Sequence, residues 1–271
     1  MSTGAPAVEG GRPGGWRLRA PRNTVPALAI FAALGAWQLS GLFLNPILIS
    51  TPSEVAHELV FLTRSGTLQI SLMQSLEEML IGMAAGLIVG LGLGLLMGRY
   101  AAVEKVLSPY VNFFNATPLV VIIPLLVIWV GISIWARLLF VFLVTLWPVL
   151  LNTLAGIKNV NRGYVEVGMA FGLSEAQVVR HISLPAAVPY ILTGIRISSG
   201  LAIIGMIVSE MEVSFVGLGF LLVHFGSAFE TGRLMAVIIV SSCFGIANVL
   251  IVKWIQSRFF PWISAMAASA L

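Results

Sequence analysis

Long apolar runs, each close to the length of a membrane crossing, fill most of this chain of 271 residues. About 20 apolar residues in a helix span the hydrocarbon core of a bilayer. Only 10% of the residues are charged, whereas a soluble domain carries roughly 25%. We therefore predict an all-α membrane protein with about six transmembrane helices. The six runs cover residues 25–44, 68–97, 109–130, 136–157, 187–208 and 234–255.

Prolines and glycines interrupt some of these apolar stretches. Three prolines interrupt the third and fourth runs, where each removes a backbone donor and bends its helix: Pro118, Pro124 and Pro148. Residues 209–231 are apolar but broken by glycines, which predicts a re-entrant or interfacial helix. Before the second run, Ser53 could cap a short amphipathic helix that continues through Leu62.

The basic residues outside the spans predict how the chain lies in the membrane. Eleven of them fall on one side: Arg12, Arg17, Arg19, Arg22, Arg99, Lys105, Lys158, Arg162, Arg180, Lys253 and Arg258. Three fall on the other: Arg64, Arg137 and Arg233. Because cytoplasmic loops carry the excess of Lys and Arg, we predict that both termini are cytoplasmic. Residues 1–22, rich in Gly, Pro and Arg, predict a disordered tail, and residues 23–271 a single transmembrane domain.

A stripe of glycines marks the second run. Five of them recur every fourth residue and so share one face of a helix: Gly82, Gly86, Gly90, Gly94 and Gly98. Small residues at this spacing let a neighbouring backbone approach closely within a membrane. We predict that this face packs against another helix.

Residues 158–186 form the longest predicted cytoplasmic connection. Within it, Gly172 should break a first short helix. Ser174 is a good N-cap for a second helix from Glu175 to His181, and Pro185 should end that helix before the fifth span. Two short helices joined at a glycine would make a compact knob, through which a soluble partner could transmit force.

The residues of this knob resemble a known family. The spacing of Glu166, Gly172, Ile182, Leu184 and Pro185 is similar to the EAA loop of binding-protein-dependent ABC importer permeases. Val167 and Gly168 stand where that family has two alanines. Four further motifs, in the expected order, resemble the nitrate, sulfonate and taurine branch: TPSE (51–54), ATPLVVIIPLLVIWVGI (116–132), LLNTLAGIKNV (150–160) and PYILTGIRI (189–197).

The resemblance implies a type I importer fold in the bacterial plasma (inner) membrane, with a coupling loop that sits in a cleft of an ATPase. The implied loop residues are Glu166, Gly168, Phe171, Gly172, Ser174, Ile182, Leu184 and Pro185. It also implies a homodimer, two ATP-binding subunits and a periplasmic or lipid-anchored substrate-binding protein. Since the chain contains no G-x-x-x-x-G-K-[ST] motif, we expect ATP and magnesium on the partner ATPase and no cofactor in this chain.

Several charged residues lie in or beside the spans. Arg196 could attract an anionic substrate in the translocation pathway, or it could be a structural arginine. Glu210 and Glu212, at the outer end of the fifth span, could shape the pathway entrance, contact the binding protein or lie exposed at the interface. Glu77 and Glu78 are interpreted as solvated or helix-start acids. The three histidines are too scattered for a metal site, and no metal is expected.

The leading hypothesis is therefore the permease subunit of an ATP-driven importer for a small anionic solute, such as nitrate, a sulfonate or taurine. The alternative solute is a neutral heterocycle such as a pyrimidine vitamin precursor. An intramembrane enzyme is less favoured, because the chain has neither G-x-S-x-G nor H-E-x-x-H. A passive channel or ion-coupled carrier would not need the docking loop. The net charge of +4 is explained by topology rather than by nucleic acid.

Overall fold

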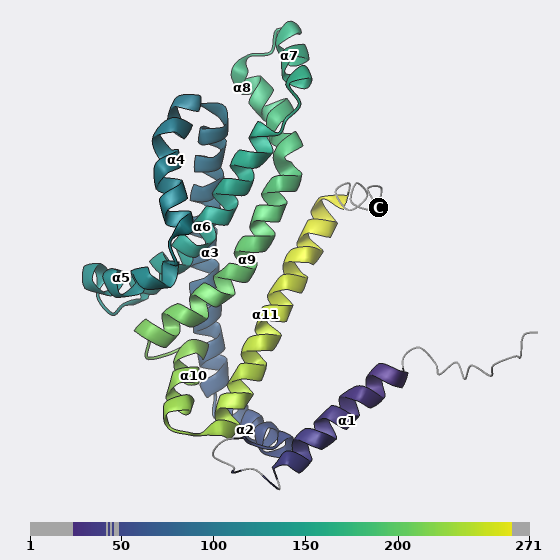
Figure 1. Cartoon of the computed structure of the whole chain (residues 1–271), viewed down its shortest axis with the longest axis vertical. Coiled ribbons are helices and arrows are strands. Elements are labelled where there is room, and N and C mark those ends of the chain that lie inside the picture. The colour runs from purple at the N-terminus through teal and green to yellow at the C-terminus, as the bar shows by residue number, and fades with distance from the viewer. Residues whose placement is uncertain (1–23, 42, 44, 46–48, 262–271) are drawn as a thin grey trace, which may run out of the picture.

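The computed structural model describes residues 24–41, 43, 45 and 49–261, and all its regular elements there are helices (Figure 1). Four helices are long and apolar enough to cross a membrane: α3 (Thr67–Arg99), α6 (Ile134–Lys158), the helix Glu175–Val213 that contains α9 (Leu184–Val213), and α11 (Thr231–Phe259). The pair formed by α4 (Ala101–Ala116) and residues 119–130 would make a fifth, bent by 97°. The prediction of an all-α membrane protein is confirmed. The first predicted span corresponds to the 17-residue α1 (Thr24–Ser40), and the predicted tail lies outside the described residues.

The glycine stripe of α3 lies directly against α6. A Cβ added at any of its five glycines would press against the side chain of a residue on α6. These α6 residues also recur at every fourth position: Val141, Thr145, Val149, Thr153 and Ile157. A Cβ at Gly86 would come within 2.9 Å of the Phe142 carbonyl oxygen, and one at Gly94 within 2.8 Å of the Leu150 carbonyl oxygen. The two helices therefore approach so closely that α3 has no room for a side chain at these five positions. Helix α9 packs along the same pair and completes the core.

The third predicted span is broken rather than merely kinked. Helix α4 ends at Ala116, and a 3-10 turn, η1 (Leu119–Ile122), leads into α5 (Ile123–Val130) in a new direction. Pro118 lies at the break, where it cannot donate a backbone hydrogen bond. Pro148 is tolerated inside α6. Figure 1 shows α5 projecting sideways from the bundle.

Helix α2 (Pro52–Arg64) corrects one prediction. Its N-cap is Thr51, whose hydroxyl oxygen accepts a hydrogen bond from the Glu54 N–H at 3.4 Å, and not Ser53. Pro52 occupies the first helical position, where its fixed φ and missing N–H suit a helix start. The glycine-broken stretch after α9 contains α10 (Leu218–Ser227), which packs between α9 and α11.

Candidate functional site

The segment between α6 and α9 folds into the predicted knob at one end of the molecule (Figure 1). Its first helix, α7 (Arg162–Ala170), is capped by Asn161, whose side-chain oxygen accepts from the Gly163 N–H at 2.9 Å. Gly172 follows the helix with φ of +81°, in the left-handed region that glycine adopts without strain. The Leu173 N–H then donates to the Gly168 carbonyl at 3.1 Å and closes the turn.

The second helix of the knob, α8 (Glu175–Val178), begins at a capping box. The Ser174 hydroxyl accepts from the Gln177 N–H at 3.4 Å, and the Gln177 side chain accepts from the Ser174 N–H at 2.8 Å. The helix does not end at Pro185, so that prediction is wrong. It continues through a π-helical turn, η2 (Val179–Ser183), into α9. The wider π turn moves the carbonyl four residues earlier away from the proline ring, which removes the usual clash.

The knob is fastened to the bundle by close packing and by ion pairs. Gly168 is buried, and a Cβ there would lie 2.5 Å from the Ile182 side chain, so the glycine lets α7 lie against η2. Arg99, at the end of α3, forms an ion pair with Glu175. Lys158, at the end of α6, pairs with Glu104 of α4. The Arg99–Glu175 pair thus joins the knob to α3, and the Lys158–Glu104 pair joins the neighbouring ends of α6 and α4.

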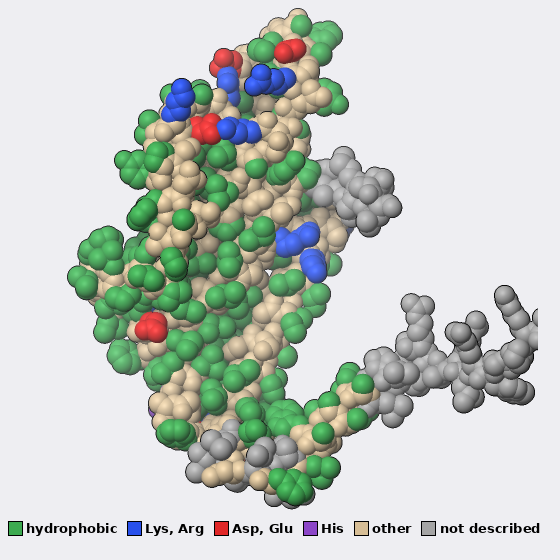
Figure 2. All heavy atoms as spheres, in the orientation of Figure 1, with side chains coloured by type: hydrophobic (Ala, Val, Ile, Leu, Met, Phe, Trp, Pro, Cys, Tyr) green, Lys and Arg blue, Asp and Glu red, His purple; other side chains and the backbone are tan. Residues whose placement is uncertain are grey.

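The outer face of the knob is apolar and exposed. Phe171 is 85% exposed, and three neighbours are each more than half exposed: Tyr164, Val167 and Met169. Of the other predicted loop residues, Glu166, Gly172, Ser174 and Pro185 are exposed, whereas Ile182 and Leu184 are half-buried. An exposed apolar patch with a polar rim is typical of a protein contact surface. Lys and Arg side chains gather at this end of the molecule (Figure 2).

Replacing Gly172 tests the turn that shapes the knob. Gly172→Val should destabilise the knob by about 1–2 kcal/mol, because a β-branched residue is strained at positive φ. Hydrogen exchange should accelerate across residues 162–178 while α3 and α6 stay protected. Gly172→Asn should have a smaller effect, since asparagine tolerates this conformation. Equal exchange in Gly172→Val and the wild type would contradict the assigned role of this glycine.

A second cluster lies inside the bundle and joins α3, α6, α9 and α10. The Arg137 Nε donates to Glu78 Oε2 at 2.7 Å, and the Ser209 hydroxyl donates to the other oxygen of Glu78 at 2.9 Å. The Ser75 hydroxyl donates to Glu210 Oε1 at 2.6 Å. The Glu78 and Arg137 side chains are only 3% and 12% exposed, and Glu210 is 1% exposed as a residue. We call Ser75, Glu78, Arg137, Ser209 and Glu210 the buried charged cluster.

This cluster overturns three expectations. Glu78 is not a solvated acid, Glu210 does not lie exposed at the interface, and Arg137 is not a loop residue but belongs to the first turn of α6. Burial is possible because each carboxylate receives several donors and Arg137 supplies a countercharge. Their sequence neighbours Glu77 and Glu212 are exposed.

Two glycines shape the chain around Glu210. The Gly219 N–H donates to Glu210 Oε2 at 2.8 Å. A Cβ at Gly217, where φ is +103°, would lie 2.6 Å from the same oxygen, and one at Gly219 would lie 2.7 Å from the Glu210 Cβ. The backbone at the start of α10 therefore packs directly against the Glu210 carboxylate. Through these contacts the carboxylate links α10 to α9.

Arg196 lies outside this cluster. Its guanidinium donates twice to the side-chain oxygen of Gln256 in α11, at 2.6 and 3.1 Å. The Gln256 amide nitrogen in turn donates to the Leu192 carbonyl at 2.8 Å. Arg196 therefore ties α11 to α9. The three residues predicted for the translocation pathway, Arg196, Glu210 and Glu212, do not form one site. Sequence analysis assigned Arg137 to a loop and did not identify Ser75 or Gln256, because no local motif marks these three residues.

The structure combines a multi-helix membrane bundle with an exposed knob between two of its spans. The chain belongs to the family described as binding-protein-dependent transport system inner membrane component, whose sequence model matches residues 82–265. It is therefore a multi-pass inner-membrane permease subunit of an ABC importer.

Individual relatives align with most of the length of this chain. It is 28% identical over 255 residues to the taurine transport system permease protein TauC of Escherichia coli (strain K12), covering 91% of this chain and 93% of that protein. It is 29% identical over 238 residues to the formylaminopyrimidine transport permease protein ThiX of Halalkalibacterium halodurans, covering 88% and 95%. The crystal structure of an amino acid ABC transporter with histidines has a similar fold, with a TM-score of 0.58 and 21% identity over 74% of this chain and 96% of that one.

Proposed function

We propose that two copies of this chain form the translocation pathway of an ATP-driven importer, and that each knob docks on one ATP-binding subunit. The observation that carries this proposal is the exposed apolar face of α7, on a knob that is continuous with α9 and paired with α3 through Arg99 and Glu175. The basic side chains at that end support placing it in the cytoplasm. A binding protein on the opposite side would deliver the solute.

The mechanism that follows is alternating access. Closure of the ATPase dimer on ATP would move the two knobs together, and the attached helices would open the pathway outward. Hydrolysis would reverse the movement. The solute crosses between the two copies without chemical change. The decisive experiment is ATPase activity of the reconstituted complex, which a loaded binding protein should stimulate.

Phe171→Asp tests the docking face. A charge at Phe171, the C-cap residue of α7 and the most exposed aromatic residue of the knob, should abolish co-purification of the ATPase, because burying an unpaired carboxylate in an apolar contact is unfavourable. Phe215→Asp is the matched control, since Phe215 is 74% exposed in the loop between α9 and α10. Pull-down of the tagged ATPase from detergent extracts measures both. If Phe171→Asp retains the ATPase as well as the control does, the knob is not the docking site.

The relatives leave two classes of solute for this proposal. TauC is named for taurine, and ThiX for formylaminopyrimidine. The expectation of an anion came from the resemblance to nitrate, sulfonate and taurine permeases and from Arg196, whose charged guanidinium is hydrogen-bonded to the neutral amide of Gln256. The choice between an anion and a neutral heterocycle therefore depends on the chemistry of the pathway itself.

A further inference from the structure

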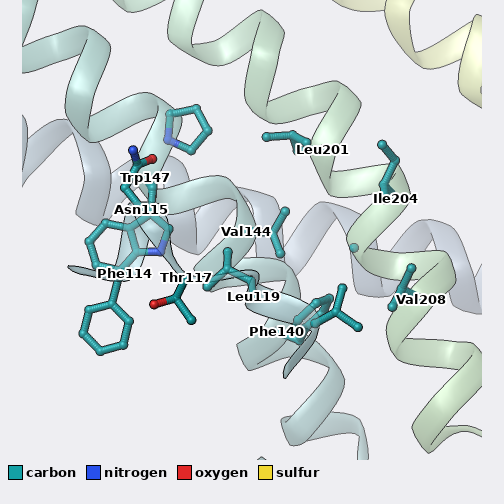
Figure 3. A pocket seen from close by; sticks show the side chains of 13 residues that line it. Phe114, Asn115, Thr117, Leu119, Phe140, Val144, Trp147, Leu201, Ile204 and Val208 are labelled. Atoms are coloured by element: carbon teal, nitrogen blue, oxygen red, sulfur yellow. The ribbon is translucent and has the colours of Figure 1, made fainter. Parts of the chain in front are cut away.

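A cavity of about 470 Å³ lies between the knob and the ends of the core helices, and we call it the knob cavity. Its walls come from the ends of α3 and α6, the start of α4, and α7, α8 and η2. Five of its lining residues are charged: Arg99, Glu104, Lys158, Arg162 and Glu175. A cavity of about 300 Å³ inside the bundle, between α4, α6 and α9, is lined among the described residues by uncharged side chains alone (Figure 3). The two cavities therefore suit ligands of different chemistry.

The knob cavity lies where membrane-spanning helices end. Arg99 is the last residue of α3, and Lys158 is the last residue of α6. Long basic side chains at the ends of spans reach the level of the lipid headgroups. The exposed Tyr100, which follows Arg99, is an aromatic residue of the kind enriched at the membrane–water boundary. The knob cavity is therefore at the depth where the headgroups of lipids lie.

One mostly buried hydroxyl faces this cavity without a partner. Ser183 is only 8% exposed and lines the knob cavity, and its side chain makes no hydrogen bond to any described residue. Its oxygen retains accessible surface, so it can donate to a ligand in the cavity. Ser183 is also the last residue of the π-helical turn η2. Such turns are rare and frequently mark functional sites.

Arg162 is a cation without a counter-ion. It lines the knob cavity and forms no ion pair within the part of the chain that the structure describes. It occupies the first position of α7, directly after the N-cap Asn161, and the first turn of this helix contains no acidic residue. The amino end of a helix carries a partial positive charge, which disfavours a cation there. An anion in the cavity would be attracted by the guanidinium and by the helix end together.

Two further cations are held only by exposed ion pairs. Arg99 pairs with Glu175, and Lys158 pairs with Glu104. These side chains are partly exposed, and ion pairs of this kind contribute little to stability. With Arg162, three cations face two carboxylates, so the cavity carries one excess positive charge. A phosphate diester, which carries one negative charge, would balance it.

Most of the remaining lining of the knob cavity is apolar. Six of these residues are Leu95, Met97, Ile157, Val165, Val178 and Val179. An inorganic anion would leave this surface uncovered, whereas the glycerol and first methylene groups of a lipid would cover it. Basic pockets between transmembrane helices bind the headgroups of anionic lipids. The combination of excess cation, buried donor and apolar wall therefore favours an amphiphile over a free phosphate ion.

We propose that the knob cavity is a binding site for an anionic phospholipid. The Ser183 hydroxyl donates to a phosphate oxygen, and Arg162 neutralises the phosphate charge. Because its walls belong to both parts, a lipid in this cavity contacts the knob and the core helices at once. This proposal goes beyond the proposed function and does not depend on docking of an ATPase.

Native mass spectrometry of the full chain, purified in detergent and freed of lipid, tests the proposal. We expect palmitoyl-oleoyl phosphatidylglycerol to bind saturably at one tight site per chain. Palmitoyl-oleoyl phosphatidylcholine has the same acyl chains but no net charge, and it should bind more weakly. In a parallel thermal-unfolding measurement, phosphatidylglycerol should raise the melting temperature, because it binds the folded chain, and sodium phosphate should not.

Two variants localise the site. Arg162→Gln should weaken phosphatidylglycerol binding about fivefold, the effect of removing one cation near a membrane surface. Ser183→Ala should weaken it about threefold to tenfold, the loss of one hydrogen bond. It should leave the melting temperature of the lipid-free chain unchanged, because this hydroxyl has no partner among the described residues. Arg180→Gln is the matched control, since Arg180 is an exposed arginine of the same η2 turn and does not line the cavity.

Three results would overturn the proposal. Equal affinities of Arg162→Gln and Arg180→Gln would show that the lipid responds to surface charge in general. Unchanged affinity in Ser183→Ala would remove the buried donor from the site. Equal binding of the two lipids, or equal stabilisation by sodium phosphate, would exclude an anionic lipid as the specific ligand. The proposed function fails in a different assay, if a loaded binding protein does not stimulate the ATPase activity of the complex.

Discussion

Arg137→Met is expected to prevent the chain from accumulating as a folded protein in the membrane. The substitution leaves Glu78 buried without the arginine that neutralises it, and Glu210 lies in the same cluster. Removing one partner of a buried ion pair destabilises proteins by about 3–5 kcal/mol. This loss is a large part of a typical total stability of about 5–15 kcal/mol. The yield of monodisperse protein after detergent extraction, and its melting temperature, measure the effect.

Two further variants separate charge from packing in this cluster. Arg137→Met combined with Glu78→Gln removes both charges, and the double variant should be more stable than Arg137→Met alone. Glu77→Gln is the control, because Glu77 precedes Glu78 on α3 but is exposed. It should melt within a few degrees of the wild type. If Arg137→Met melts like the control, the cluster does not stabilise the bundle as we infer.

Gly86→Val should separate α3 from α6. The new side chain would press against the Phe142 carbonyl and Thr145, and backbone atoms cannot move aside as a flexible side chain can. Overpacking of a core commonly destabilises by about 1–3 kcal/mol, and contact with a helix backbone places this variant at or above the upper end. Thermal unfolding followed by the extractable folded fraction measures the loss.

Gly92→Val provides a matched control on the same helix. A Cβ at Gly92 would meet nothing within 4 Å, because this glycine points away from α6. The expected change in stability is within about 0.5 kcal/mol. Equal losses in the two variants would show that helix propensity, and not the α3–α6 contact, explains the glycines.

Local patterns in the sequence predicted much of the fold. Apolar runs gave the positions of α3, α6, α9 and α11, because a membrane requires helices of that length. The left-handed turn at Gly172 and the capping box at Ser174 follow from residues that lie next to each other. These features need no knowledge of tertiary packing.

The buried charged cluster could not be predicted in the same way. Glu78 and Arg137 are 59 residues apart, and Ser75 and Glu210 are 135 apart, so no local spacing brings them together. Glu77 and Glu78 are adjacent residues of the same type. Which of them is buried depends on how α3 is oriented about its own axis in the bundle. The same limit applies to Arg196, whose partner Gln256 lies 60 residues away.

Helix Glu175–Val213 joins the two ends of the molecule in one piece. Its 39 residues correspond to roughly 58 Å at 1.5 Å per residue. One end lies in the knob, and Glu210 with its hold on α10 lies near the other. Under the proposed function, a displacement of the knob would be carried along this helix, through its π-helical turn, to α10 at the opposite end of the bundle.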